Sequence, residues 1–223
     1  MEQSITSFSN ENTRRVDFSR RSGRRRSAGA SMALKRAFDL TVATLALILF
    51  SPLIIAILAI IILRDGTPAI FRQERIGRGG RPFTLYKFRT MVKNSESDGN
   101  ARLCSEHDDR LTPIGAFLRA HHLDELPQLW NVIRGDMSLV GHRPERRVFI
   151  EKIMQENRDY ALLYSLRPGV FSMATLYNGY TDTMEKMLRR LKMDLDYMRN
   201  RSLMLDIKII WLTFFSIISG KKF

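Results

Sequence analysis

The sequence predicts an α-rich α+β fold, with apolar helices near both ends and a small polar domain of helices with a minor β element between them. Residues 40–63 form an apolar run without a single charge, and residues 203–223 form a second apolar stretch. The region between them is polar, with mostly helical periodicity. We therefore divide the chain into a tail (1–34), a membrane helix (35–63), a polar domain (64–200) and a C-terminal helix (201–223).

The tail is strongly basic. Residues 1–36 hold nine Lys or Arg and three acidic residues, so much of the net charge of +13 lies there. The tail is also rich in Ser, Asn and Gly and poor in large apolar residues, so we expect it to be disordered. A basic segment beside an apolar run favours anionic membrane lipids, by about 1 kcal/mol per Lys or Arg near the surface. Nucleic acid is not an expected partner, because no basic–aromatic platform or reading motif accompanies the charge.

The apolar run 40–63 has two interpretations. As a helix it is roughly 36 Å long, which is enough for a hydrocarbon core of about 30 Å. However, Ser51-Pro52 lies in its middle, and a proline kinks a helix. Basic residues flank both ends, which the positive-inside rule places on the cytoplasmic face. The residues alone leave open a kinked transmembrane helix and a re-entrant helix that bends at Ser51-Pro52, with the Ser51 hydroxyl available to the freed backbone groups.

The C-terminal stretch is also ambiguous. Its apolar residues Leu205, Ile209, Leu212 and Phe215 recur at helical spacing, and Trp211 and the final lysines suit a membrane interface. A helix that faces the core of the polar domain fits the same pattern.

The polar domain contains one strand-like pair and several helical segments. Residues 83–91 alternate and are rich in aromatic residues and Thr, so they predict a strand with 70–75 as its hairpin partner, joined through a glycine-rich turn. Residues 94–109 are polar and predict a loop. Helical periodicity marks four segments: 113–122, 126–133, 146–164 and 183–200.

Two adjacent carboxylates, Asp124 and Glu125, stand just before Pro127. Asp124 suits an N-cap and proline suits a first helical turn, so capping is one explanation. Chemistry is the other, because helix starts also bind phosphate and arginine forks match phosphate oxygens. Carboxylates beside a phosphate need a cation, usually Mg²⁺, and an aspartate in that setting can attack phosphorus.

Other site types fit less well. The four histidines and the lone Cys104 show no zinc spacing, and one cysteine cannot form an internal disulfide. Adjacent carboxylates do not suit a glycosidase, whose pair must flank a sugar bond. The glycine-rich turn at 77–80 lacks the lysine of a P-loop.

At the level of motifs, the chain from about Lys35 to its end resembles the bacterial sugar transferase family, the monotopic polyprenyl-phosphate hexose-1-phosphate transferases (phosphoglycosyl transferases). The matching pieces are K-R-x-F-D (35–39), S-P (51–52), Y-K-F-R-T-M (86–91), D-x-R-L-T-P-I-G (108–115), L-D-E-L-P-Q-L-W-N-V (123–132), G-D-M-S-L-V-G (135–141), R-P (143–144), R-P-G (167–169) and the D-x-D-Y…L-D-I-K-I end (194–209).

The resemblance implies a re-entrant helix broken at Ser51-Pro52, with both flanks and the catalytic domain on the cytoplasmic face of the bacterial inner membrane. It implies that Asp124 attacks a UDP-sugar and releases UMP. The sugar phosphate then passes to polyprenyl (undecaprenyl) phosphate, which initiates a surface glycan. Glu125 completes the dyad, Mg²⁺ bridges Asp124 and the diphosphate, and a homo-oligomer is compatible with this picture.

The resemblance also assigns substrate-binding positions, which are Lys87, Arg89, Arg119, Arg143, Arg167 and the acid Asp194. Two departures lie where nucleotide or sugar recognition is expected. His142 stands where the family has proline, and Val170–Leu176 replace the family's I-T-G-x-x-Q-V. The alternative function is a catalytically inactive membrane adaptor of a glycan assembly complex, which the intact Asp124, Glu125 and Lys87 disfavour.

Overall fold

The computed structural model describes residues 18–93, 95, 108–178 and 181–218, and within these ranges the side chains of residues 31–217. Helix α1 (Phe18–Leu49) begins inside the tail, for which the sequence predicts disorder unless it is bound. Arg, Ala and Met in this segment favour helix, and extending the existing apolar helix needs no new nucleus. Residues 1–17, and most of the loop predicted at 94–109, lie outside the described residues. Residues 1–35 and 36–223 form separate compact units.

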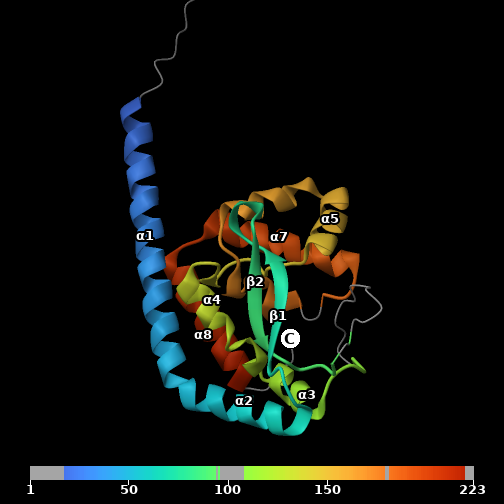
Figure 1. Ribbon diagram of the computed structural model, residues 1–223. Coiled ribbons are helices and arrows are strands. Elements are labelled where there is room, and N and C mark those ends of the chain that lie inside the picture. Colours follow the sequence, from blue (N-terminus) through green and yellow to red (C-terminus); the bar gives the residue numbers. More distant parts are fainter. Residues whose placement is uncertain (1–17, 94, 96–107, 179–180, 219–223) are drawn as a thin grey trace, which may run out of the picture. The chain divides into compact units, whose positions relative to one another are not determined.

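The predicted break at Ser51-Pro52 is confirmed. Helix α1 ends at Leu49, α2 (Ser51–Asp65) follows, and the two axes bend by 59° (Figure 1). Pro52 has no N–H for the carbonyl of Ile48, its normal helical partner. The Ser51 hydroxyl donates to that carbonyl instead, at 2.8 Å. The serine therefore satisfies the backbone group that the proline leaves without an amide donor.

The bent pair keeps much of its apolar surface exposed. Leu49 at the end of α1 and Leu63 near the end of α2 are 72% and 84% exposed. Among the described residues no single helix has the length and composition to cross a membrane, whereas Ser31–Leu49 and Ser51–Asp65 together do. The opposite side of α2 is not exposed: Ile57 and Ile61 are buried with Phe88 and Leu118 in one core cluster.

The N-terminal basic motif ties α1 to the polar domain. Arg36 donates to the carbonyls of Val132 and Ile133 at 2.8 and 3.2 Å. Asp39 is buried and accepts hydrogen bonds from the Ser138 hydroxyl, at 2.7 Å, and from the Leu139 backbone. These bonds hold α1 to the polar domain at Arg36 and Asp39, just before its apolar part begins.

The predicted hairpin is present. Strands β1 (Ile70–Ile76) and β2 (Pro82–Phe88) are antiparallel, with Phe71 opposite Lys87, and the short helix η1 (Arg78–Gly80) joins them. Helix α3 (Pro113–Ala120) follows, where Thr112 accepts a hydrogen bond from the Gly115 N–H as a regular N-cap. The turn η2 (Leu123–Glu125) and helix α4 (Gln128–Arg134) come next.

A second, parallel pair of strands was not predicted. Strand β3 (Ser138–Val140) lies beside β4 (Gly169–Phe171), and both are too short for a visible alternation. The chain crosses closely here, since a Cβ on Gly169 would lie 2.1 Å from the Gly141 nitrogen. Only glycine fits at such a crossing. The crossing fixes the start of the loop 141–146.

The remaining helices are α5 (Arg147–Glu156), η3 (Arg158–Ser165), α6 (Met173–Asn178), α7 (Met184–Asn200) and α8 (Leu203–Ile218). The single helix predicted at 146–164 is therefore two. Asn157 leaves the helical conformation and its side chain accepts a hydrogen bond from the Asp159 N–H, which starts a new turn.

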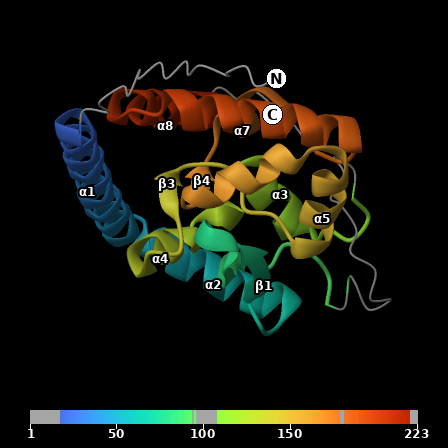
Figure 2. The ribbon, with the colours of Figure 1, turned by 90° about the horizontal axis from the view of Figure 1, so that it is seen from above.

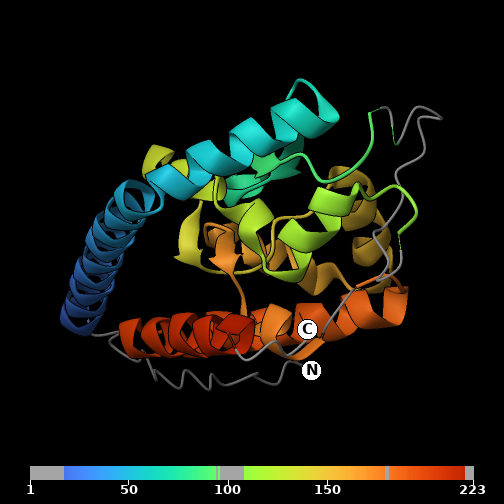
Figure 3. The same cartoon turned by 90° about the horizontal axis from the view of Figure 1, so that it is seen from below.

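Figures 2 and 3 show the strands, α3 and α4 lying between α2 on one side and the line of α7 and α8 on the other. Helix α8 packs one side against the core, as one interpretation of the C-terminal stretch predicts, and its place at a membrane interface stays a prediction. Ile209 is buried in the core, while Trp211 and Phe215 are exposed and contact each other edge to face.

Candidate active site

The turn η2 carries the two adjacent carboxylates, and it differs from the capping prediction. Helix α4 starts at Gln128 with Pro127 as its N-cap, and no side chain caps it. Asp124 and Glu125 lie in the preceding tight turn, where His122 adopts a left-handed conformation with φ 54°. The acids turn toward basic side chains instead of the helix amides, so capping does not explain them.

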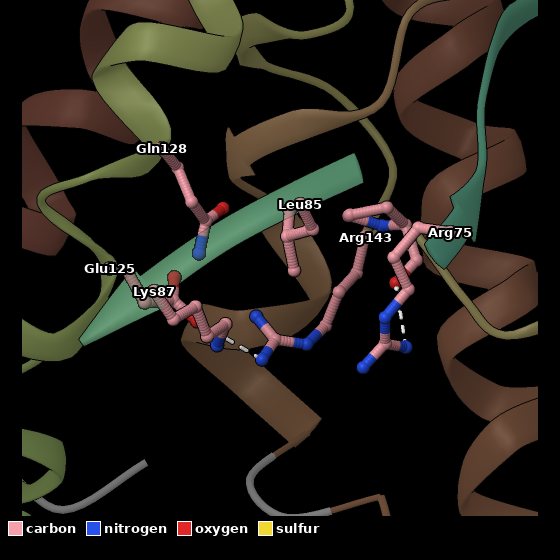
Figure 4. A pocket seen from close by; sticks show the side chains of 7 residues that line it. Arg75, Leu85, Lys87, Glu125, Gln128 and Arg143 are labelled. Atoms are coloured by element: carbon pink, nitrogen blue, oxygen red, sulfur yellow. Dashed lines mark hydrogen bonds and ion pairs between the residues drawn. The ribbon is translucent and has the colours of Figure 1, made fainter. Parts of the chain in front are cut away.

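Two cations from other elements meet the carboxylates. Lys87, near the end of β2, lies 2.6 Å from Glu125 and 3.6 Å from Asp124. Arg143, from the loop after β3, donates to the same Glu125 oxygen at 3.1 Å (Figure 4). Glu125 therefore holds Lys87 and Arg143 together, and Asp124 contacts Lys87 alone of the two.

The two acids have opposite electrostatics. Burial raises the pKa of Asp124 above its ordinary value, Lys87 opposes the rise, and the neighbouring Glu125 adds to it. Burial also acts to raise the pKa of Glu125, but Lys87 and then Arg143 outweigh it, and the pKa of Glu125 falls well below its ordinary value. Glu125 is therefore ionised in the folded protein. Asp124 is a buried carboxyl, and Lys87 is the main group that stabilises its ionised form.

A small pocket opens beside this pair (Figure 4). It is lined by Arg75, Leu85, Lys87, Glu125, Gln128, Arg143 and Pro144. Three of its seven lining residues carry positive charge and one carries negative charge. The pocket is therefore suited to an anion.

Helix α7 holds the loop that carries Arg143. Asp194 accepts a hydrogen bond from the Arg143 backbone, and Arg190, one turn earlier on the helix, forms an ion pair of 2.7 Å with Glu145. Glu145 reaches Arg75 on β1 with its other oxygen, also at 2.7 Å. Two buried residues of α7 therefore hold this loop, Asp194 at the Arg143 backbone and Arg190 at Glu145.

We expect Asp194→Asn to change how stability depends on pH. Burial raises the pKa of Asp194 to about 7, against an ordinary value of 3.8. Between these values the folded protein holds a proton that the unfolded chain has lost, so this group's contribution to stability falls as pH rises from about 4 to 7. Asparagine cannot titrate, and its carbonyl can still accept from Arg143. The melting temperature of the variant relative to wild type should therefore be higher at pH 8 than at pH 5.5, and an equal difference at both would contradict the assignment.

The other basic positions named by the resemblance are spread out. Arg119, at the end of α3, donates to the Thr90 hydroxyl at 2.9 Å, and its charge lowers the pKa of Asp124. Arg89 is buried and donates to the carbonyls of Asp65, Gly66 and Pro68 after α2, so its guanidinium is used on the backbone.

Arg167 and the two departures also lie away from the lining. Arg167 donates to the Gly135 carbonyl at 2.9 Å, and burial with Arg36 and Arg78 nearby lowers its pKa. His142 is 2% exposed, and burial lowers its pKa to about 4, so it is neutral at pH 7. Its ring Nδ1 has no hydrogen-bond partner among the described residues. Residues 170–176 form β4 and the start of α6.

Sequence reasoning missed Arg75, Gln128, Glu145 and Arg190. Gln128 had a usable signal, since it stands in the L-D-E-L-P-Q-L-W-N-V motif that carries the family resemblance. The other three belong to β1, a loop and α7, which are far apart in the sequence, so no spacing links them. Only the tertiary fold brings them together.

The donor set around Asp124 fits one kind of metal site. The described residues contain no group of three or more His, Cys, Asp or Glu side chains that could hold a metal alone. Mg²⁺ at phosphate sites usually takes one or two carboxylates and completes its shell with water and substrate phosphates. Because Lys87 lies closer to Glu125 than to Asp124, Asp124 is the more available oxygen donor.

Comparison with known proteins gives a consistent result. The sequence model of the family described as "Bacterial sugar transferase" matches residues 30–220. A UDP-N-acetylgalactosamine-undecaprenyl-phosphate N-acetylgalactosaminephosphotransferase of Aeromonas hydrophila is 39% identical over 84% of this chain and 44% of its own length. A UDP-glucose:undecaprenyl-phosphate glucose-1-phosphate transferase of Escherichia coli K12 is 42% identical over 84% of this chain and 41% of its own length.

The chain therefore spans less than half of these two relatives. A relative of more similar length is a Bacillus subtilis protein described as the uncharacterized sugar transferase EpsL. It is 39% identical over 82% of this chain and 86% of its own length.

Proposed function

Because the chain belongs to the bacterial sugar transferase family, we propose that it transfers a sugar 1-phosphate from a UDP-sugar to undecaprenyl phosphate in the cytoplasmic membrane. The product, a diphosphate-linked lipid sugar, initiates a surface polysaccharide. The observation that carries the proposal is the contact of buried Asp124 with Lys87, a residue that lines a cationic pocket, within the stretch shared with the relatives.

Asp124 is the nucleophile in this proposal. Its carboxylate oxygen attacks the phosphorus that carries the sugar, and the bond from that phosphorus to the oxygen bridging the two phosphates breaks. UMP leaves with that bridging oxygen, and the sugar phosphate stays on Asp124 as an acyl phosphate. An oxygen of the lipid phosphate then attacks the same phosphorus. The Asp124–phosphorus bond breaks, and the free carboxylate returns.

The surrounding residues make this attack feasible. Lys87 stabilises the ionised form of Asp124 and stands next to the phosphorus that Asp124 attacks. Glu125 fixes Lys87 and Arg143 at 2.6 and 3.1 Å, so both cations are in place before the substrate arrives. Fixed charges of this kind stabilise the charge that develops on phosphoryl oxygens without reorganisation.

Asp124 would also hold Mg²⁺ together with the donor diphosphate. When bound, the ion supplies positive charge that offsets repulsion between the carboxylate and the phosphate oxygens. We expect thorough EDTA treatment to remove UMP release, because the nucleophile and the diphosphate are both anionic, and added Mg²⁺ to restore it. Retention of full activity in EDTA would contradict this role.

The bent pair α1–α2 would enter the cytoplasmic leaflet and return, with the tail and the catalytic domain on the same face. This topology accounts for the basic residues on both flanks of 40–63 and for the bend at Pro52. It also places Asp124 in the compartment that holds nucleotide sugars. The exposed aromatic residues of α8 would lie in the interface of the same leaflet.

Pro52→Ala should convert part of the population to a membrane-crossing form. Alanine restores the N–H that can bond to the Ile48 carbonyl and removes a ring clash, a change of about 3 kcal/mol in a helix interior. The test uses single cysteines at Ser9 and Asp159 in a protein with Cys104 replaced, labelled in intact cells with an impermeant thiol reagent. Neither position should label in wild type, and one should label in the variant. Labelling of one position in wild type would contradict the re-entrant topology.

The activity itself is tested with a panel of UDP-sugars, with UDP-glucose and UDP-N-acetylgalactosamine first because the named relatives use them. The purified protein in lipid nanodiscs should release UMP from at least one donor and form a lipid-linked sugar. An inactive adaptor would release none from any donor.

A further inference from the structure

Arg75 stands in the pocket wall, and the proposed chemistry gives it no task. It lines the same pocket as Lys87 and Arg143 (Figure 4). Its guanidinium donates to Glu145 at 2.7 Å, to the Pro144 carbonyl at 3.3 Å and to the Gln73 side chain at 2.6 Å. These bonds fix its position. Its Nε–H is buried with no hydrogen-bond partner among the described residues, so one donor is unused. An unused buried donor is rare and points to a missing partner.

The charges around Arg75 are not balanced. Glu145 binds both Arg75 and Arg190, just as Glu125 binds both Lys87 and Arg143. Each of these two carboxylates thus faces two cations, and because Asp124 also contacts Lys87, the four cations exceed the three carboxylates by one charge. Burial lowers the pKa of Arg75, Glu145 opposes this, and the neighbouring Arg143, Arg146 and Arg190 add to the fall. A buried cation of this kind is stabilised when an anion approaches.

The three cations follow one another away from the nucleophile. Lys87 is the one that contacts Asp124, Arg143 contacts Glu125, and Arg75 lies beyond Arg143 beside Pro144 (Figure 4). Phosphoryl transfer is in line, so the group that leaves departs on the side opposite the attacking oxygen. A phosphate on Lys87 next to Asp124 would then be followed by a second phosphate on the side where Arg143 and Arg75 lie.

We propose that Arg75, with Arg143, forms a subsite for a phosphate monoester. This subsite holds the phosphate of the departing UMP and then the phosphate of the incoming polyprenyl lipid. The two must use one place, because in a double displacement the second nucleophile enters along the line by which the first group left. The inference rests on the proposed function and names the group that this side of its site binds. Arg75 is a substrate-binding residue in this account, and Glu145 and Arg190 position it.

The test compares Arg75→Gln and Arg75→Lys with wild type, and uses Arg72→Gln as a matched control from the same strand with an exposed side chain. The full chain in nanodiscs is assayed for inhibition by UMP and by uridine, which lacks the phosphate, and for the KM of undecaprenyl phosphate. Arg75→Gln should raise the inhibition constant of UMP and the KM of the lipid by about 10- to 100-fold each, the value of one charge-assisted hydrogen bond. Inhibition by uridine should not change.

A purely structural role for Arg75 would weaken UMP and uridine alike, so an unchanged ratio of their inhibition constants would overturn the subsite. A loss for UMP without a loss for the lipid would overturn the claim that the subsite is shared. If Arg75→Gln does not fold, Arg75→Lys decides, since it keeps the charge but loses the fork and should show a smaller shift of the same ratio. Wild type that releases no UMP from any UDP-sugar would overturn the proposed function and this inference together.

Discussion

Asp124→Asn should abolish UMP release, by about 10⁴-fold or more, which is the scale for the loss of a catalytic nucleophile. The substitution keeps the shape of the side chain and removes the charge that attacks phosphorus. It also removes a buried carboxyl whose pKa burial raises, so the folded protein should be no less stable than wild type. Steady-state UMP release and thermal melting, measured on the same preparation, check both statements.

A matched control separates charge from position. Asp159→Asn makes the same chemical change at an exposed site in η3 and should leave turnover unchanged. If Asp124→Asn retains UMP release within a few-fold of wild type, Asp124 is not the nucleophile.

Lys87→Met should reduce turnover by about 10²- to 10³-fold, the usual cost of losing one preorganised charge at a phosphoryl or acyl transfer site. It should also shift the pH dependence. Lys87 lowers the pKa of Asp124, so its removal raises that pKa further. The nucleophile must be ionised, and the acid limb of the pH–rate profile should therefore move to higher pH. Lys152→Met, on the exposed side of α5, serves as the control and should change neither quantity.

The same substitution should destabilise the fold, because Glu125 would lose one of its two cations while staying buried. Removing one partner of a buried ion pair costs about 3–5 kcal/mol. A second substitution, Glu125→Gln, removes the stranded charge and should recover part of the melting temperature without recovering turnover. Recovery of turnover in the double variant would show that Lys87 matters only for the fold.

Local sequence patterns predicted much of this fold. The alternation at 83–91 and the glycine-rich turn predicted the hairpin β1–β2, and Ser51-Pro52 predicted the bend between α1 and α2. Each depends on a short-range rule, such as the missing N–H of proline or the period of a strand. The parallel pair β3–β4 was missed because three-residue strands show no period. That the tail is disordered unless bound stays a prediction, although α1 begins inside it at Phe18.

For a similar reason, the sequence predicted some residues of the candidate site and missed others. Asp124 and Glu125 were named from their adjacency and place before Pro127, and the family resemblance assigned substrate binding to Lys87 and Arg143. The fold brings Lys87 within 4 Å of both acids and Arg143 within 4 Å of Glu125. Arg89 was named in the same way, yet its guanidinium binds backbone carbonyls after α2. The cluster of Arg75, Glu145 and Arg190 could not be predicted, because ion pairs between segments far apart in the sequence produce no recognisable residue spacing.

The central claim is a covalent sugar phosphate on Asp124, and intact-mass measurement followed by peptide mapping tests it most directly. The protein is incubated with its UDP-sugar in the absence of lipid phosphate and quenched under conditions that preserve an acyl phosphate. The account predicts a gain equal to one sugar phosphate, confined to the peptide that contains Asp124, absent from Asp124→Asn, and lost when undecaprenyl phosphate is added. UMP release without any such adduct, or an adduct on another residue, would contradict it.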